Sequence, residues 1–176
     1  MPMFMATGER FMGNDSKGSR GVNLEDTKKS MADLQKRIDS NDLPSSDTIY
    51  YMALNYFSGN ATGEVDLEKG LELTEKAAEL GNADAMCSLG DLYLEGDLVK
   101  KDVKKGLSLI QQAAQRNTGT GLCALGLLYF EGKFLPKDEQ KALDLFQKAA
   151  EQNHIIAIER LGNIYLNGTE IIKADP

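Results

Sequence analysis

The chain has 176 residues, 41% of them hydrophobic and 27% charged, a composition typical of a folded domain or array and not of a disordered polymer. Its net charge of −7, without a cluster of Lys and Arg, argues against a nucleic-acid partner, because phosphates repel an acidic surface. No apolar run approaches the roughly 20 residues of a membrane-spanning helix, so no membrane insertion is expected. The two cysteines, Cys87 and Cys123, suit neither a disulfide framework nor a zinc site. These features predict a soluble protein in a reducing, cytoplasmic location.

Residues 1–46 precede the regular part of the chain. Asp26 and Asn41 fall 40 residues before Asp66 and Gly81, which belong to the regular part. Between them apolar residues recur with helical spacing, at Met31, Leu34 and Ile38. We therefore expect either a degenerate repeat or one capping helix here, preceded by a mobile loop near residues 14–21.

From residue 47 onward the chain repeats itself. Four tyrosines follow one another at steps of 37, 36 and 36 residues: Tyr56, Tyr93, Tyr129 and Tyr165. Three residues before each tyrosine stands a very small residue: Ala53, Gly90, Gly126 and Gly162. A fixed period of this length is typical of stacked structural repeats. We divide residues 47–176 into units 47–82, 83–118, 119–154 and a partial unit 155–176.

The first segment of each unit reads as a helix. In residues 83–95, Ala85, Leu89 and Tyr93 are spaced by four and so share one helical face. The glycine before the tyrosine lets another helix approach closely. A second glycine three residues after the tyrosine, such as Gly96, ends the helix, because glycine adopts the left-handed conformation at little cost.

The second segment of each unit also reads as a helix. It opens with an aspartate suited to cap the first turn: Asp66, Asp102 or Asp138. It closes at a residue that tolerates a left-handed cap: Gly81, Asn117 or Asn153. One helix pair cannot bury both of its apolar faces, so the pairs must stack into an all-α array.

The pattern A-x-x-x-L-G-x-x-Y-x-x-G, followed by an acidic N-cap and K/Q-A-A, resembles the Sel1-like repeat, a relative of the tetratricopeptide repeat. The resemblance covers residues 47–175 and departs modestly in the first unit, which has Met52-Ala53 for Leu-Gly and one extra loop residue. It implies an α-solenoid, a right-handed superhelix of antiparallel helix pairs, that serves as an interaction scaffold.

The sequence offers no recognisable chemistry. His154 is the single histidine and follows a helix cap, and the glycines stand at helix ends and not in a phosphate-binding loop. Neither Cys87 nor Cys123 has a general base in its repeat pattern. We expect no catalytic residue, metal or cofactor. Hydrolysis of the β-lactamase type, once linked to some relatives, is the least favoured alternative.

The resemblance places the first helix of each pair on the concave face. It puts the inward positions six residues before, two before and one after each tyrosine: Tyr50, Leu54 and Phe57; Cys87, Asp91 and Leu94; Cys123, Leu127 and Phe130; Glu159, Asn163 and Leu166. The row after the tyrosines is apolar throughout and suits a docked helix or extended peptide. With Asp91 and Glu159 beside it, this predicts an adaptor whose protein or peptide partner is apolar with basic residues. The alternative is that these residues pack within the array.

At the C-terminal end, residues 155–167 form a helix without its antiparallel partner. Asp175 and Pro176 fall where the next helix is due to begin. The chain is then a fragment of a longer array, or a second copy covers the open face in a homodimer. The apolar residues of that face are Ile155, Ile156, Ile158, Leu161, Ile164, Ile171 and Ile172.

Overall fold

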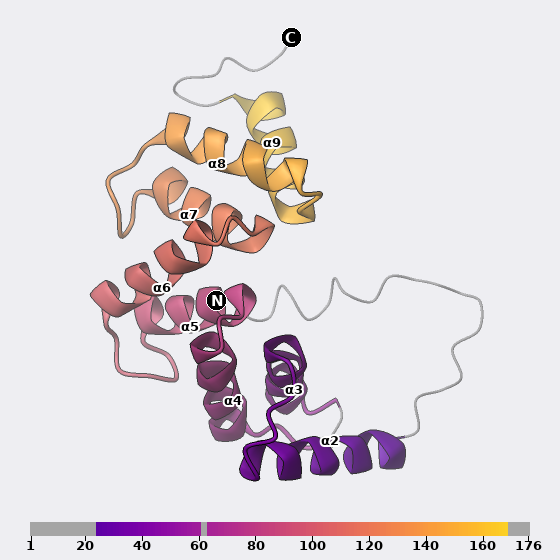
Figure 1. Cartoon of the computed structure of the whole chain (residues 1–176). Coiled ribbons are helices and arrows are strands. Elements are labelled where there is room, and N and C mark those ends of the chain that lie inside the picture. The colour runs from indigo at the N-terminus through magenta and orange to yellow at the C-terminus, as the bar shows by residue number, and fades with distance from the viewer. Residues whose placement is uncertain (1–23, 61–62, 169–176) are drawn as a thin grey trace, which may run out of the picture. The chain divides into compact units, whose positions relative to one another are not determined.

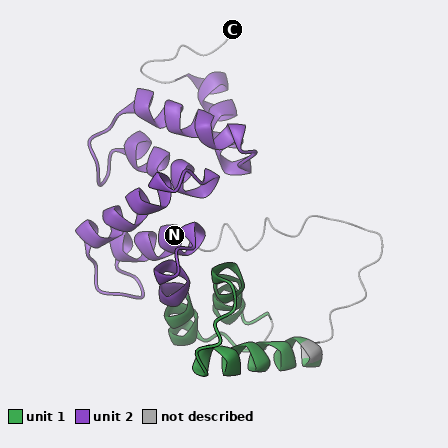
Figure 2. Ribbon diagram, in the orientation of Figure 1, with its two compact units in different colours: residues 1–73 green, residues 74–176 purple. Residues whose placement is uncertain are grey.

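The structure is a computed structural model that describes residues 24–60 and 63–168, which form eight helices and no strand (Figure 1). The all-α prediction is therefore confirmed. The predicted mobile loop at residues 14–21 lies outside the described residues. The chain divides into two compact units, residues 1–73 and 74–176, and the boundary falls inside helix α4 (Leu67–Glu79) (Figure 2).

The first unit contains α2 (Leu24–Asp39), α3 (Ser46–Ser58) and the beginning of α4. Helix α2 lies where the sequence predicted a helix, and it buries Met31 and Ile38. Helix α3 is capped by Ser45, whose hydroxyl oxygen accepts a hydrogen bond from the Thr48 N–H at 3.2 Å. Its buried face is short, at Ile49, Met52 and Ala53.

The second unit contains the end of α4 and five helices of 13 residues each: α5 (Ala83–Glu95), α6 (Val103–Gln115), α7 (Gly119–Glu131), α8 (Glu139–Glu151) and α9 (Ile155–Asn167). From α5 onward each helix packs against the next, and the first helices α5, α7 and α9 also contact one another in sequence order. This is the stack of helix pairs that the period predicts (Figure 1).

The predicted caps are present. The Oδ1 atoms of Asp66, Asp102 and Asp138 accept hydrogen bonds of 2.9, 3.0 and 2.9 Å from backbone N–H groups three residues on. Each such cap contributes about 1 kcal/mol of stability. Positive φ angles mark the other ends, at the glycines Gly59, Gly96 and Gly132 and at the asparagines Asn41, Asn117 and Asn153.

A recurring backbone hydrogen bond closes each hairpin. The N–H of Asp66 donates to the Tyr56 carbonyl at 2.9 Å, and the same bond, at the same distance, joins the equivalent residues of the next two repeats. The first repeat keeps this bond although its loop is one residue longer. The bond therefore fixes where the second helix starts, independently of loop length.

Close packing inside the hairpins explains the small residue before the tyrosine. A Cβ added to Gly90 would lie 2.7 Å from Cγ1 of Ile110, and one added to Gly126 would lie 2.8 Å from the Phe146 ring. Ile110 and Phe146 are fully buried. The missing Cβ thus admits a large side chain of the second helix, and this places most of the core between the two helices of a pair.

Candidate functional site

In the first unit, the predicted groove residues lie on α3 and are only partly accessible. Leu54 is exposed, whereas Tyr50 and Phe57 are half-buried. Phe57 packs against α4, because a Cβ on Gly70 would lie 2.8 Å from its ring. Phe57 therefore belongs to the packing of its own hairpin.

In the second unit, four of the predicted groove residues are buried and do not line a free surface: Cys87, Leu94, Cys123 and Leu127. Leu94, only 2% exposed, packs on Gly106, where an added Cβ would lie 2.8 Å from its Cγ. The ring of Phe130 lies 6.3 Å from that of Phe146 in the same hairpin. Phe57, Leu94 and Phe130 of the predicted apolar row thus pack against the second helix of their own pair, in line with the alternative that these residues pack within the array.

The acidic residues of the predicted groove remain accessible in part. Burial, and then the nearby Glu95 and Glu131, raise the pKa of half-buried Asp91 to about 6. Glu95 is itself paired with Lys133, with Nζ 2.8 Å from Oε1, and this hydrogen bond holds the pKa of Glu95 below its ordinary value. Asp91 forms no ion pair with the residues that the structure describes. Its position therefore suits a cationic group from elsewhere.

The two thiols are poor nucleophiles at neutral pH. Burial raises the pKa of Cys123 to about 11, against a smaller opposite effect of Arg160. Burial, followed by Asp91 and Asp84, raises the pKa of Cys87 further. Both cysteines are free and buried. Among the described residues, no three His, Cys, Asp or Glu side chains gather as they would around a metal ion.

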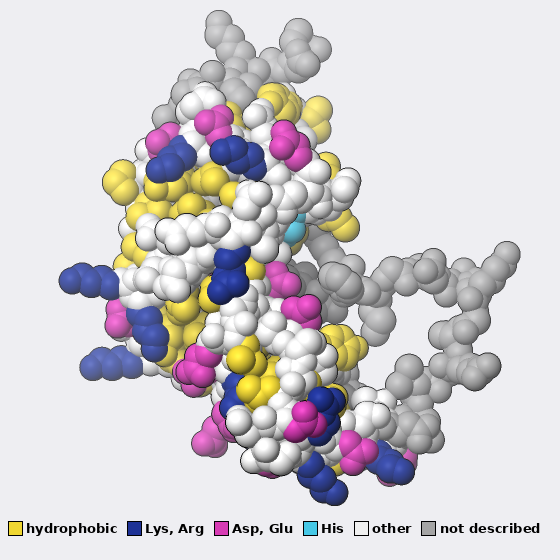
Figure 3. Space-filling model, viewed as in Figure 1, with side chains coloured by type: hydrophobic (Ala, Val, Ile, Leu, Met, Phe, Trp, Pro, Cys, Tyr) yellow, Lys and Arg dark blue, Asp and Glu magenta, His cyan; other side chains and the backbone are white. Residues whose placement is uncertain are grey.

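The most open apolar surface lies on α9. Its exposed large residues are Ile155, Ile158, Tyr165 and Leu166, of which Ile155 and Leu166 are more than 70% exposed. Hydrophobic side chains show along this edge of the second unit in Figure 3. Around Gly162 the described residues leave the space open, since a Cβ added there would meet none of them within 4 Å, in contrast to Gly90 and Gly126.

The predicted members of this face are placed unequally. Ile155 and Ile158 are exposed and Ile156 and Leu161 are half-buried, but Ile164 is buried in the core cluster of Phe146. The prediction that Ile164 belongs to the open apolar face is therefore wrong, because Ile164 packs against α7 and α8. Ile171 and Ile172 lie outside the described residues.

A cavity of about 200 Å³ adjoins the α9 face. Phe130, Phe146 and Ile164 form its apolar wall, and the remaining lining residues are Arg160, Asn163, Asn167 and Gly168. Asn163 and Phe130 were predicted as groove residues, whereas exposed Glu159 does not line the cavity. One repeat earlier, Leu94, Ile110 and Leu128 form the equivalent cluster, against which Phe134 and Leu135 of the following loop pack. Apolar side chains of the chain itself thus pack at the position that is equivalent to the cavity in the preceding repeat.

Two features escaped the sequence reasoning. The open space at Gly162 follows from the same glycine pattern, but only the structure shows that none of the side chains it describes fills this space. A lysine recurs in the second helix of each complete repeat, at Lys69, Lys105 and Lys141. The contacts of Lys105 with Tyr93 and of Lys141 with Tyr129 were not foreseen.

A comparison with protein-family models identifies these hairpins. The model for the Sel1 repeat matches residues 46–82, 83–117, 120–154 and 155–176. The chain belongs to the Sel1 repeat family. No curated protein sequence shows a significant similarity to it. Sel1 repeat proteins are generally scaffolds for protein interactions and are typically not catalytic.

Solved structures of Sel1 repeat proteins share the fold. A Sel1 repeat protein from Oxalobacter formigenes is 27% identical with a TM-score of 0.68 over 85% of this chain. The protective antigen c5321 of uropathogenic Escherichia coli is 26% identical over 86% with a TM-score of 0.59, and Helicobacter pylori cysteine rich protein B is 26% identical over 80% with a TM-score of 0.57.

The lengths of these Sel1 relatives differ from that of this chain. The match spans 59% of the Oxalobacter protein, 38% of the Escherichia coli antigen and 98% of the Helicobacter protein. No helix among the described residues is both long and apolar enough to cross a membrane.

Proposed function

We propose that this Sel1 repeat chain is a non-enzymatic scaffold that holds a partner protein on the open side of α9. The observation that carries the proposal is the space at Gly162, which no residue of 24–60 or 63–168 fills and which exposed Ile158 and Leu166 flank. At the two equivalent glycines a second helix of the same chain fills this space. Exposed apolar residues gathered on one helix face are typical of a binding site.

The second helices of the complete repeats indicate what kind of partner would fit this surface. In α6, Gly106 packs against Leu94. Ile110, four residues further along α6, packs over Gly90. In α8 the corresponding residues are Ala142 and Phe146. We therefore infer an amphipathic helix of the partner with Gly or Ala opposite Leu166 and a bulky apolar side chain seated over Gly162. Burying one such side chain contributes about 1.5–3 kcal/mol.

A peptide with the sequence of residues 137–153, which includes α8, is a direct probe of this surface. We expect the ¹⁵N-labelled chain to bind it with shifts confined to α9, and expect Gly162→Leu to abolish binding because its side chain fills the space. The matched control is Gln112→Leu, which adds the same side chain to an exposed position of α6. A peptide carrying Phe146→Ala should bind at least tenfold more weakly, in line with the loss of one large apolar contact.

Unchanged binding to the Gly162→Leu chain would locate the partner elsewhere. Two other occupants of this surface are a second copy of the chain in a homodimer, and further repeats of a longer Sel1 protein. Light scattering distinguishes the first of these. A dimer that Gly162→Leu converts to a monomer would replace the partner helix with a second copy of the chain.

The inner surface of α5, α7 and α9 is a second proposed contact for the same partner. Its support is Asp91, a half-buried carboxylate without a cation among the described residues. A Lys or Arg of the partner would restore the ordinary ionisation of this group. The hydrolytic alternative has no support from the thiols, because burial raises the pKa of both.

A further inference from the structure

Two repeats of this chain hold an ammonium group against their tyrosine. Lys105 Nζ lies 4.1 Å from the centre of the Tyr93 ring and donates a 2.6 Å hydrogen bond to its hydroxyl. Lys141 lies 4.1 Å from the Tyr129 ring and bonds its hydroxyl at 2.7 Å. The hydrogen bond to the tyrosine raises the pKa of both lysines. In both repeats the tyrosine thus binds an alkylammonium group through its ring and its hydroxyl.

The first repeat has the same tyrosine and lysine but does not join them. Lys69 Nζ instead bonds Glu72 Oε2 at 2.8 Å, and no cation of the described residues lies over the Tyr56 ring. The sequence explains the difference. Ser108 replaces this glutamate in the second repeat, and the shorter Asp144 of the third accepts a hydrogen bond from Gln140.

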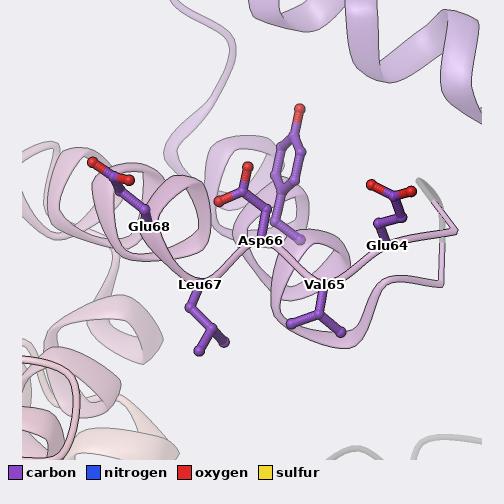
Figure 4. Close-up of a pocket in the computed structure, with 6 residues that line it drawn as sticks. Glu64, Val65, Asp66, Leu67 and Glu68 are labelled. Carbon is purple, nitrogen blue, oxygen red and sulfur yellow. The ribbon is translucent and has the colours of Figure 1, made fainter.

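The surroundings of Tyr56 are acidic. The ring lines an open pocket of about 430 Å³ whose other lining residues are Glu64, Val65, Asp66, Leu67 and Glu68. In Figure 4 the three carboxylates point to one side of the chain, and Val65 and Leu67 point to the other. In the second repeat the positions of Glu64 and Glu68 are occupied by Lys100 and Lys104. The charge around this tyrosine is therefore reversed.

We propose that the Tyr56 pocket binds the side chain of a lysine presented by another protein. The tyrosine face attracts the ammonium by a cation–π interaction, as it does with the chain's own lysine in the next two repeats. Glu64 and Glu68 add attraction, and Glu72 keeps Lys69 from taking the place. This site is separate from the proposed α9 surface and does not depend on it.

The test uses a short blocked peptide, acetyl-Ala-Lys-Ala-amide, titrated into the whole ¹⁵N-labelled chain. We expect saturable shifts of the amide signals of Glu64, Asp66 and Glu68 with a dissociation constant on the order of millimolar, as suits one exposed cation contact. The same peptide with Nε-acetyl-lysine should not bind, because acetylation removes the charge.

Variants separate the pocket from general attraction to an acidic chain. Tyr56→Leu should weaken binding about fivefold or more, whereas the matched Tyr93→Leu should not. Glu68→Lys, an exposed change that copies the second repeat, should also weaken it and keeps the test valid if Tyr56→Leu unfolds. Glu72→Gln should weaken binding by releasing Lys69 onto the ring. Equal shifts with the acetylated peptide, or binding unaffected by both Tyr56→Leu and Glu68→Lys, would overturn the proposal.

Discussion

Alanine at the glycine before the tyrosine should have opposite effects in α7 and α9. In α7, a Cβ on Gly126 would lie 2.8 and 2.9 Å from two atoms of the Phe146 ring. Phe146 is fully buried, so a shift of its ring would disturb the core packing of the hairpin. In α9, a Cβ on Gly162 meets no atom of the described part of the chain within 4 Å. The same substitution therefore tests packing at one site and helix propensity alone at the other.

The expected magnitudes follow from these distances. Replacing Gly by Ala inside a helix gains about 0.5–1 kcal/mol, because alanine loses less backbone entropy on folding. Gly162→Ala should show this gain in the free energy of unfolding. Overpacking a core costs about 1–3 kcal/mol. After the helix gain is subtracted, Gly126→Ala should lower the free energy of unfolding by roughly 1 kcal/mol, and by at most about 2.5 kcal/mol.

Urea unfolding followed by circular dichroism at 222 nm measures both variants against the parent chain. The midpoints should move in opposite directions with little change in slope. Gly90→Ala, whose Cβ would lie 2.7 Å from Ile110, should behave like Gly126→Ala. A loss of stability in Gly162→Ala equal to that in Gly126→Ala would refute the reasoning, because it would show that a large group already covers α9.

Two further predictions concern ionisable groups. In the folded chain Asp91 binds its proton more tightly than in the unfolded chain, because its pKa is raised to about 6. The contribution of Asp91 to the free energy of unfolding is therefore largest at low pH and falls as the pH rises to about 6. Asp91→Asn should therefore raise the free energy of unfolding by about 1–2 kcal/mol at pH 7.5 but little at pH 4, which urea unfolding at the two pH values checks. Cys87 and Cys123 should react with a disulfide reagent at pH 8 more than about tenfold slower in the native chain than in urea, as absorbance shows, and equal rates would contradict their burial.

The sequence predicted where helices end better than it predicted which helix covers each helical face. Caps such as Asp102 and ends such as Asn117 depend on a residue and its own backbone, so a local pattern suffices to find them. Leu94 was misplaced because helical spacing shows which residues share a face but not which helix covers it. Lys69 and Lys105 occupy the same repeat position, yet their partners differ through a single residue one turn further on. Such choices between nearby partners need coordinates.

The hydrogen bond from the capping aspartate to the tyrosine carbonyl has a practical consequence for engineering. Because that bond sets the start of the second helix, we expect the loop between Gly96 and Lys101 to tolerate insertions. A peptide tag spliced after Asp97 should leave the register of the following helices intact. New recognition loops are therefore most easily grafted at these tips, one in each repeat.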